Sequence, residues 1–307
     1  MKNKFRLEKY ALPKKYEIFI EPDLENEKFA GNEKIQIQIK ESTNQIKLNS
    51  IGLKIYKPKL IDSNNNEYIP EINFDNKHEI VEFNFDQEIK EGAYELYLEF
   101  SGILDNSLRG FYMSTYQDPK GKLHKIGTTQ FESTDARRAF PCFDEPEFKS
   151  IFSIKLKVPK DLFTVSNSSL KNTINEDNKL IYEFNDTIKM STYLVAFIMG
   201  PFEETDELIV DGTPLRIVFP EGKKDLSKFA LDVGEFALKY FTDYFGRPYP
   251  GDKLDMIAIP DFASGAMENL GCITYREALL LVDEKNATQG ELTRIADVIC
   301  HEIAHMW

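Results

Sequence analysis

Two histidines and a glutamate near the end of the sequence have the types and spacing of a metal site on one helix. His301, Glu302 and His305 stand in the stretch HEIAHMW. On a helix of about 3.6 residues per turn, His305 lies about 40° around the axis from His301, so both imidazoles face the same way. Glu302 lies about 100° from His301, beside a shared metal and off the ligand axis. The pattern predicts zinc bound by the histidines, with Glu302 as the base that deprotonates a water made acidic by the metal.

A chance match on an ordinary amphipathic helix is the alternative interpretation. Three fixed residues in five arise by accident in roughly a few per cent of chains of this length. Against chance, the chain has four histidines and two of them stand in this motif. Leu292, Ile295, Val298 and Ile299 already supply the apolar stripe of such a helix. We therefore interpret the motif as functional.

Catalytic zinc normally has three protein ligands and one open position, and the motif supplies two. In the gluzincin pattern the third ligand is a glutamate on a later helix. In the metzincin pattern it is a histidine six residues after His305. Both positions lie beyond Trp307, so the motif alone does not choose between them.

Alternation of apolar and polar residues dominates the sequence from about residue 14 to 203. Ile35, Ile37 and Ile39 alternate with polar neighbours, and similar runs recur along the segment. Such a period of two is typical of antiparallel strands with one buried face. The pattern predicts an all-β, sandwich-like N-terminal domain over residues 1–203.

A mixed α and β pattern follows over residues 204–307. Apolar residues recur at three and four across 225–246, which predicts an amphipathic helix with this stripe: Leu226, Phe229, Val233, Phe236, Tyr240, Phe241, Tyr244. Short apolar runs at 253–260 and 277–282 predict strands. Thr288 and Glu291 have the spacing of a capping box, so a second helix is expected from there.

Composition and charge limit the class of protein. The chain has 307 residues, a net charge of -13 and three widely spaced cysteines. These features predict a cytoplasmic protein without a disulfide framework, and no basic patch suggests nucleic acid. No apolar run is long enough for a bilayer, so no membrane partner is expected.

A second motif makes the sequence resemble a known family. Residues 265–269 read GAMEN, 33 residues before the histidine motif when Glu268 is compared with His301. Residues 127–149 and 190–202 carry two further similar stretches. The chain resembles the gluzincin zinc aminopeptidases related to aminopeptidase N, puromycin-sensitive aminopeptidase and the tricorn-interacting factors. This resemblance implies a thermolysin-like α+β catalytic domain after the β domain.

The resemblance also implies residue roles. His301 and His305 would bind one Zn²⁺ and Glu302 would be the general base. Peptides with a free N-terminus would be the substrates, with residues 127–149 forming a loop that recognises that terminus. The implied substrate-binding residues are Glu132 and Glu268 for the α-ammonium, Gln130 for the first side-chain pocket, and Gly265, Ala266, Met267 and Asn269 of the GAMEN segment.

An enzyme that removes one residue at a time needs a fixed reference point at the substrate terminus. A pair of carboxylates recognises a cationic amine and leaves an acetylated terminus unheld. The neighbouring charged residues are expected to form structural ion pairs: Asp135, Arg137, Arg138, Asp144, Glu145.

By the resemblance, the chain ends within the zinc helix and lacks the third ligand. We therefore expect weak zinc binding and little activity from these 307 residues. The alternatives are a bifunctional epoxide hydrolase and aminopeptidase, which that branch of the family marks with glutamine in place of Glu132; a metzincin-like endopeptidase; and a non-catalytic β-sandwich interaction module.

Overall fold

The computed structural model describes residues 6–118 and 120–307. The chain forms two compact units, and each unit is built from three segments that are separate in the sequence. Of the described residues, the first comprises 6–112, 130–158 and 171–195, and the second comprises 113–118, 120–129, 159–170 and 196–307. The described residues include no helix with the length and apolarity needed to cross a bilayer.

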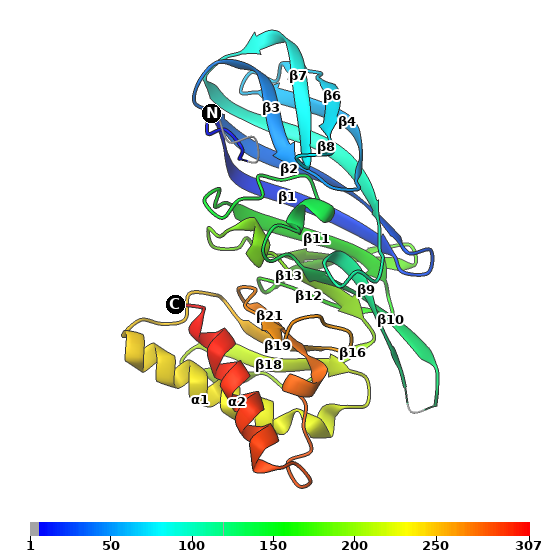
Figure 1. The fold of residues 1–307 in the computed structure, drawn as a ribbon, viewed down its shortest axis with the longest axis vertical. Coiled ribbons are helices and arrows are strands. Elements are labelled where there is room, and N and C mark those ends of the chain that lie inside the picture. Colours follow the sequence, from blue (N-terminus) through cyan, green and yellow to red (C-terminus); the bar gives the residue numbers. More distant parts are fainter. Residues whose placement is uncertain (1–5, 119) are drawn as a thin grey trace. The chain divides into compact units, whose positions relative to one another are not determined.

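Two β-sheets make up the first unit (Figure 1). The larger has the order β13-β14-β11-β1-β2-β8-β4-β5, and the smaller has the order β3-β7-β6. Two short 3-10 turns, η1 (Ala136–Arg138) and η2 (Thr192–Leu194), are the helical segments described here. The strands are β1 (Ala11–Asp23), β2 (Lys28–Ile39), β3 (Thr43–Asn49), β4 (Lys54–Asp62), β5 (Glu67–Tyr68), β6 (Glu71–Asp75), β7 (Ile80–Ile89), β8 (Gly92–Ile103), β11 (Ile151–Pro159), β13 (Leu170–Glu176) and β14 (Lys179–Phe184).

The expected all-β N-terminal domain is confirmed, with one difference in pairing. β1 and β2 are antiparallel, as predicted. β1 pairs in parallel with β11, in a register that sets Lys15 opposite Ile151 and Ile20 opposite Leu156. Alternation of burial is the same in both kinds of pair, so the sequence pattern carried no information about strand direction.

The second unit combines two sheets with two helices. One sheet has the order β12-β15-β10-β9, and the other has the order β16-β18-β19-β21-β20 with β17 added to β18. β18, β19 and β21 are parallel. Figure 1 shows α1 and α2 over this second sheet. The elements are β9 (Gly110–Gln117), β10 (Leu123–Gln130), β12 (Phe163–Ser166), β15 (Phe197–Gly200), β16 (Phe202–Glu204), β17 (Leu208–Val210), β18 (Thr213–Pro220), η3 (Lys224–Leu226), α1 (Lys228–Phe245), β19 (Leu254–Ile259), β20 (Ala266–Met267), β21 (Cys272–Arg276), η4 (Glu277–Leu279) and α2 (Gln289–Ala304).

The strand expected at 253–260 is present as β19, whereas the strand expected at 277–282 was wrong. There the chain forms the turn η4, in which Leu280 and Leu281 donate backbone hydrogen bonds to Glu277. A short apolar run does not distinguish a strand from a buried turn.

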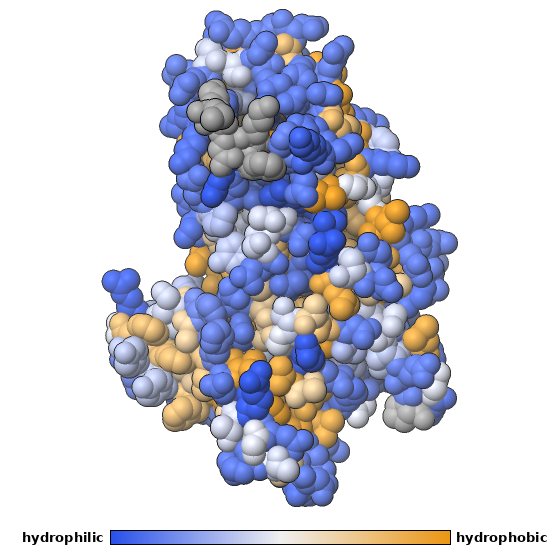
Figure 2. Space-filling view, in the orientation of Figure 1, coloured by the Kyte–Doolittle hydropathy of each residue, from blue (hydrophilic) through white to orange (hydrophobic). Residues whose placement is uncertain are grey.

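Helix α1 buries the predicted stripe only in part: Phe229, Val233 and Phe241 pack against the core and are partly buried. Its buried residues are small ones and a leucine: Ala230, Gly234, Ala237, Leu238. A Cβ added at Gly234 would lie 2.5 Å from Met256 Cε, so the helix backbone lies close to β19 and a larger residue would require the methionine end to move. Phe236, Tyr240 and Tyr244 are exposed, and Figure 2 shows apolar residues at the surface over α1. Small residues thus occupy the fully buried positions of α1, while the aromatic part of the stripe is left exposed.

We expect Leu238→Ala, at a side chain that is 1% exposed, to lower the free energy of unfolding by about 2–5 kcal/mol. Phe236→Ala, at a larger side chain that is 64% exposed, should change it by less than about 0.5 kcal/mol. Urea unfolding of both variants measures the difference. Equal losses would contradict the burial of α1 described above.

Glu33 is a fully buried acid in the middle of β2. Its carboxylate oxygens have no hydrogen-bond partner among the described residues. Burial raises the pKa of Glu33 well above its ordinary value, because a charge is poorly solvated in the core. The folded chain therefore holds this side chain as a neutral acid.

Folding favours the protonated form of Glu33, so its contribution to stability is complete below the unfolded pKa, about 4.3, and is lost as pH rises towards the folded pKa. From pH 5 to 7, the free energy of unfolding should fall relative to Glu33→Gln by up to about 1.4 kcal/mol per pH unit. Urea unfolding at each pH tests this, with the exposed Glu17→Gln as the matched control. A constant difference between the parent and Glu33→Gln would be the contrary result.

Candidate active site

Helix α2 carries the histidine motif, and its start is fixed by the predicted capping box. Glu291 N donates to Thr288 Oγ1 at 3.2 Å, and Thr288 N donates to Glu291 Oε2 at 2.8 Å. Ile295, Ile299 and Ile303 follow one another at intervals of four and pack into the core of the second unit. This apolar row sets the rotation of the helix, so His301 and His305 lie on its exposed side.

The two imidazoles converge. His301 Nε2 and His305 Nε2 are 3.1 Å apart, and the ring centroids are 4.8 Å apart. Two nitrogen ligands of one tetrahedral zinc, each at about 2.05 Å, would be about 3.3 Å apart. The pair therefore fits a single metal ion, as the spacing of four residues predicts.

Two carboxylates lie beside this pair. Glu268, Glu302 and His305 each offer a ligand atom within 4.8 Å of those of the other two. Glu302 is 6% exposed and Glu268 is half-buried. Like charges this close repel each other, so a cation between them lowers the electrostatic energy. The arrangement suits a metal ion, a substrate ammonium group or both.

Strand pairing holds the GAMEN segment against β21. In β20, Ala266 is opposite Tyr275 and Met267 is opposite Thr274. Arg276 N also donates to Gly265 O at 2.9 Å. β20 is the last strand in the order of its sheet. In the described part of the chain, its outer edge therefore has no strand neighbour.

The side chains of Met267 and Asn269 are buried. Asn269 Nδ2 donates to Cys272 O at 3.3 Å and to Thr274 Oγ1 at 3.2 Å. Asn269 therefore anchors the turn between β20 and β21. A substrate could contact these two residues only through their main chain.

Glu132 belongs to the first unit and Glu268 to the second, and Gln130 is the residue at which the chain passes from the second unit back into the first. Gln130 is the buried last residue of β10, and Glu132 is exposed just after it. A joint action of Glu132 and Glu268 stays a prediction.

The expected ion pairs after Glu132 are present. Arg138 Nε lies 2.5 Å from Asp135 Oδ1, and Arg137 Nε lies 2.9 Å from Asp144 Oδ2. Glu145 pairs with Arg6 at 2.9 Å. These contacts brace the segment that follows Glu132.

Tyr275 was not singled out in the sequence. It is fully buried on β21, and its pKa is raised, first by burial and then by the nearby charge of Glu302. It contributes to the packing behind the Glu302 carboxylate. Its place one strand after the GAMEN segment is the only sequence signal that could have pointed to it.

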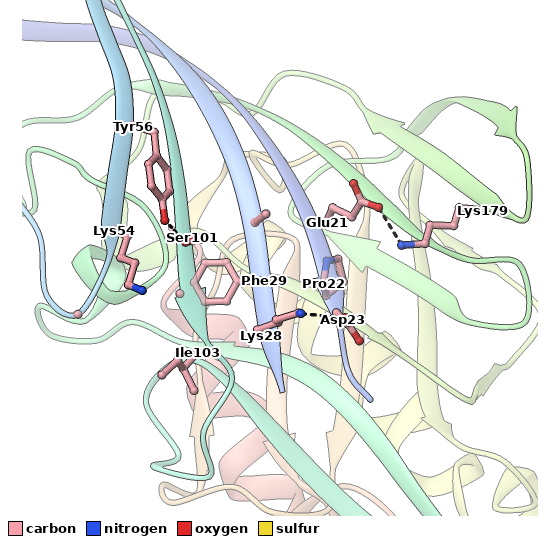
Figure 3. A pocket seen from close by; sticks show the side chains of 13 residues that line it. Glu21, Pro22, Asp23, Lys28, Phe29, Lys54, Tyr56, Ser101, Ile103 and Lys179 are labelled. Atoms are coloured by element: carbon pink, nitrogen blue, oxygen red, sulfur yellow. Dashed lines mark hydrogen bonds and ion pairs between the residues drawn. The ribbon is translucent and has the colours of Figure 1, made fainter. Parts of the chain in front are cut away.

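A cavity of about 460 Å³ in the first unit contains none of the predicted site residues. Figure 3 shows its lining, in which Lys179 pairs with Glu21 at 2.8 Å and Lys28 with Asp23 at 3.8 Å. Its charges are thus largely satisfied within the chain. Cavity size therefore does not mark the candidate site.

Comparison with known proteins agrees with the motifs. The Peptidase M1 N-terminal domain matches residues 12–194, and the Peptidase family M1 domain matches residues 229–307. The chain belongs to peptidase family M1, which confirms the family expected from the GAMEN and histidine motifs.

Several aminopeptidases are similar to this chain. Aminopeptidase M1 of Arabidopsis thaliana is 40% identical over 306 residues, covering 98% of this chain and 35% of that protein. Aminopeptidase 2 of Candida albicans is 41% identical, covering 96% and 32%. Endoplasmic reticulum aminopeptidase 1 of Homo sapiens is 36% identical, covering 99% and 33%. The chain spans about a third of the length of these relatives.

One glycine is required by the turn after the GAMEN segment. Gly271 has a φ of +72°, and a Cβ there would lie 2.1 Å from Asn167 O. Gly246, after α1, also has a positive φ, of +62°, but a Cβ there would meet nothing within 4 Å. Substitutions at the two positions therefore distinguish the cost of backbone strain, present at both, from the cost of a steric clash, present at Gly271.

We expect Gly246→Ala to lower the free energy of unfolding by about 1 kcal/mol, from backbone strain alone. Gly271→Ala should lower it by about 3 kcal/mol or more, because a clash adds to the strain. Thermal and urea unfolding compare the two. Similar losses would show that the turn relaxes freely around Gly271.

Proposed function

We propose that the protein is a zinc-dependent aminopeptidase that removes N-terminal residues from peptides. This chain would supply its N-terminal β domain, residues 1–203, and the first part of a thermolysin-like catalytic domain, residues 204–307. The convergence of His301 and His305 at 3.1 Å, with Glu268 and Glu302 alongside, carries the proposal. Similar proteins that are named as aminopeptidases support the proposal.

His301 and His305 would hold the zinc, which as a Lewis acid would polarise a peptide carbonyl and acidify water. Glu302, mostly shielded from solvent, would accept a proton from the attacking water and later pass it to the leaving amine. Its buried position favours proton transfer because bulk water does not compete for the carboxylate.

Glu268, together with Glu132 from the first unit, would bind the α-ammonium, and Gln130 would line the first side-chain pocket. The free edge of β20 supports a role for Gly265 and Ala266 in pairing with an extended peptide. A substrate held by its terminus would present its first amide to the metal. The active protein would thus act on free N-termini only.

The three cysteines are unpaired, which supports the proposed cytoplasmic location. No partner other than peptide substrate is proposed.

We expect weak zinc binding by this chain, because the motif provides two histidine ligands where a catalytic site normally has three protein ligands. In a zinc titration by calorimetry, His305→Ala should weaken binding about 10-fold or more, since one ligand is lost. His124→Ala is the matched control, because His124 pairs with Asp118 at 3.1 Å. Equal affinities for the parent and His305→Ala would refute the assigned metal ligands.

We expect little hydrolysis of leucyl-coumarin by this chain, and none of N-acetyl-leucyl-coumarin. Activity should disappear in Glu302→Gln, which keeps the shape but removes the base. Cleavage of the acetylated substrate would indicate an endopeptidase. Stoichiometric zinc with rapid hydrolysis would show that the chain is active by itself.

A further inference from the structure

The loop from Glu268 to Gly271 joins β20 to β21 and carries the carboxylate that approaches the histidine motif. Pairing of Met267 with Thr274 fixes the start of the loop. Its last two carbonyl groups point into the second unit and need hydrogen-bond donors there. Two buried side chains from outside the loop supply those donors.

Asn167 supplies the first donor. Its Nδ2 donates to Leu270 O at 2.8 Å, and its Oδ1 accepts from Ala196 N at 2.8 Å. Its own main-chain oxygen occupies the space beside Gly271 that a Cβ would need. Asn167 therefore holds the loop by a side-chain bond and by direct packing.

Lys253 supplies the second donor. Its Nζ donates to Gly271 O at 2.7 Å, to Ser166 O at 2.6 Å and to Asp255 Oδ2 at 2.7 Å. The side chain is 6% exposed. Asp255 in turn accepts from Arg216 Nε at 2.7 Å.

The cluster contains two cations, Lys253 and Arg216, and two carboxylates, because Arg216 also pairs with Glu204. Burial opposes ionisation of Asp255, but Lys253 and Arg216 outweigh it and hold its pKa below the ordinary value. A carboxylate and two main-chain carbonyls surround the Lys253 Nζ, which offsets the cost of burying this polar group. Lys253 is thus a strong, fixed donor to the loop.

We propose that Asn167 and Lys253 are positioning residues that hold Glu268 in place for a substrate's terminal amine. The inference rests on the proposed function for the role of Glu268, whereas the clamp itself rests on the contacts above. Asn167 lies 103 positions before Leu270. A residue from the N-terminal part of the sequence therefore holds the loop that carries Glu268.

The test compares Asn167→Asp with the parent. Aspartate keeps the acceptor for Ala196 N, loses the donor to Leu270 O and sets a charge against that carbonyl. Hydrogen exchange, followed by mass spectrometry, should become about 10-fold faster or more at the amides of Cys272 and Asp255, which bond to the loop carbonyls of Asn269 and Gly271. Binding of L-leucinamide should weaken about 10-fold, while zinc affinity changes less than about two-fold.

Ser166→Ala is the matched control, because Ser166 Oγ donates to Ala196 O at 2.8 Å and not to the loop. Asn167→Ala removes the donor without adding a charge, although it also removes the acceptor for Ala196 N, and Lys253→Gln tests the second contact. Both should repeat the effect on exchange and on leucinamide.

Exchange and leucinamide affinity that match Ser166→Ala would overturn the proposal. A parent that fails to prefer L-leucinamide over N-acetyl-leucinamide would overturn the proposed function of Glu268. The exchange comparison decides the clamp in either case.

Discussion

The candidate site depends on the rotation of α2 about its own axis. A row of isoleucines at intervals of four packs into the core, and the capping box sets where the helix begins. Because both are fixed, His301 and His305 lie on the exposed side of the helix. Glu302, the residue after His301, is 6% exposed and therefore buried. Rotation by one residue, about 100°, would exchange the environments of the imidazoles and the carboxylate.

The second requirement is a loop that brings negative charge to this helix. Glu268 approaches Glu302 and His305 because β20 pairs with β21 and because buried donors satisfy the carbonyls of the following turn. A buried ionic cluster such as Lys253 with Asp255 is often no more stable than apolar packing. In this protein the cluster has a role that apolar side chains could not fill, because Lys253 donates hydrogen bonds to the main-chain oxygens of Ser166 and Gly271.

Two predictions made from the sequence patterns differ from the structure for the same physical reason. The apolar stripe of α1 packs against the core only in part, because its fully buried positions are mainly small residues, Ala230, Gly234 and Ala237, beside the sheet. The run at 277–282 was expected to be a strand, but it forms a turn beside the core. In both cases apolarity was identified correctly, while the packing partner decided the geometry.

The sequence by itself determined the β domain, the capped helix that carries the histidine motif, and the family, because alternation, capping and the GAMEN and histidine motifs are local patterns. Convergence of His301 and His305 is also local, since residues four apart share one face of a helix. Only the tertiary structure decided that Glu268 joins Glu302, that β1 pairs in parallel with β11, and that Asn167 holds the loop. Those contacts join distant segments, and their geometry depends on how the whole core packs, which no local pattern specifies.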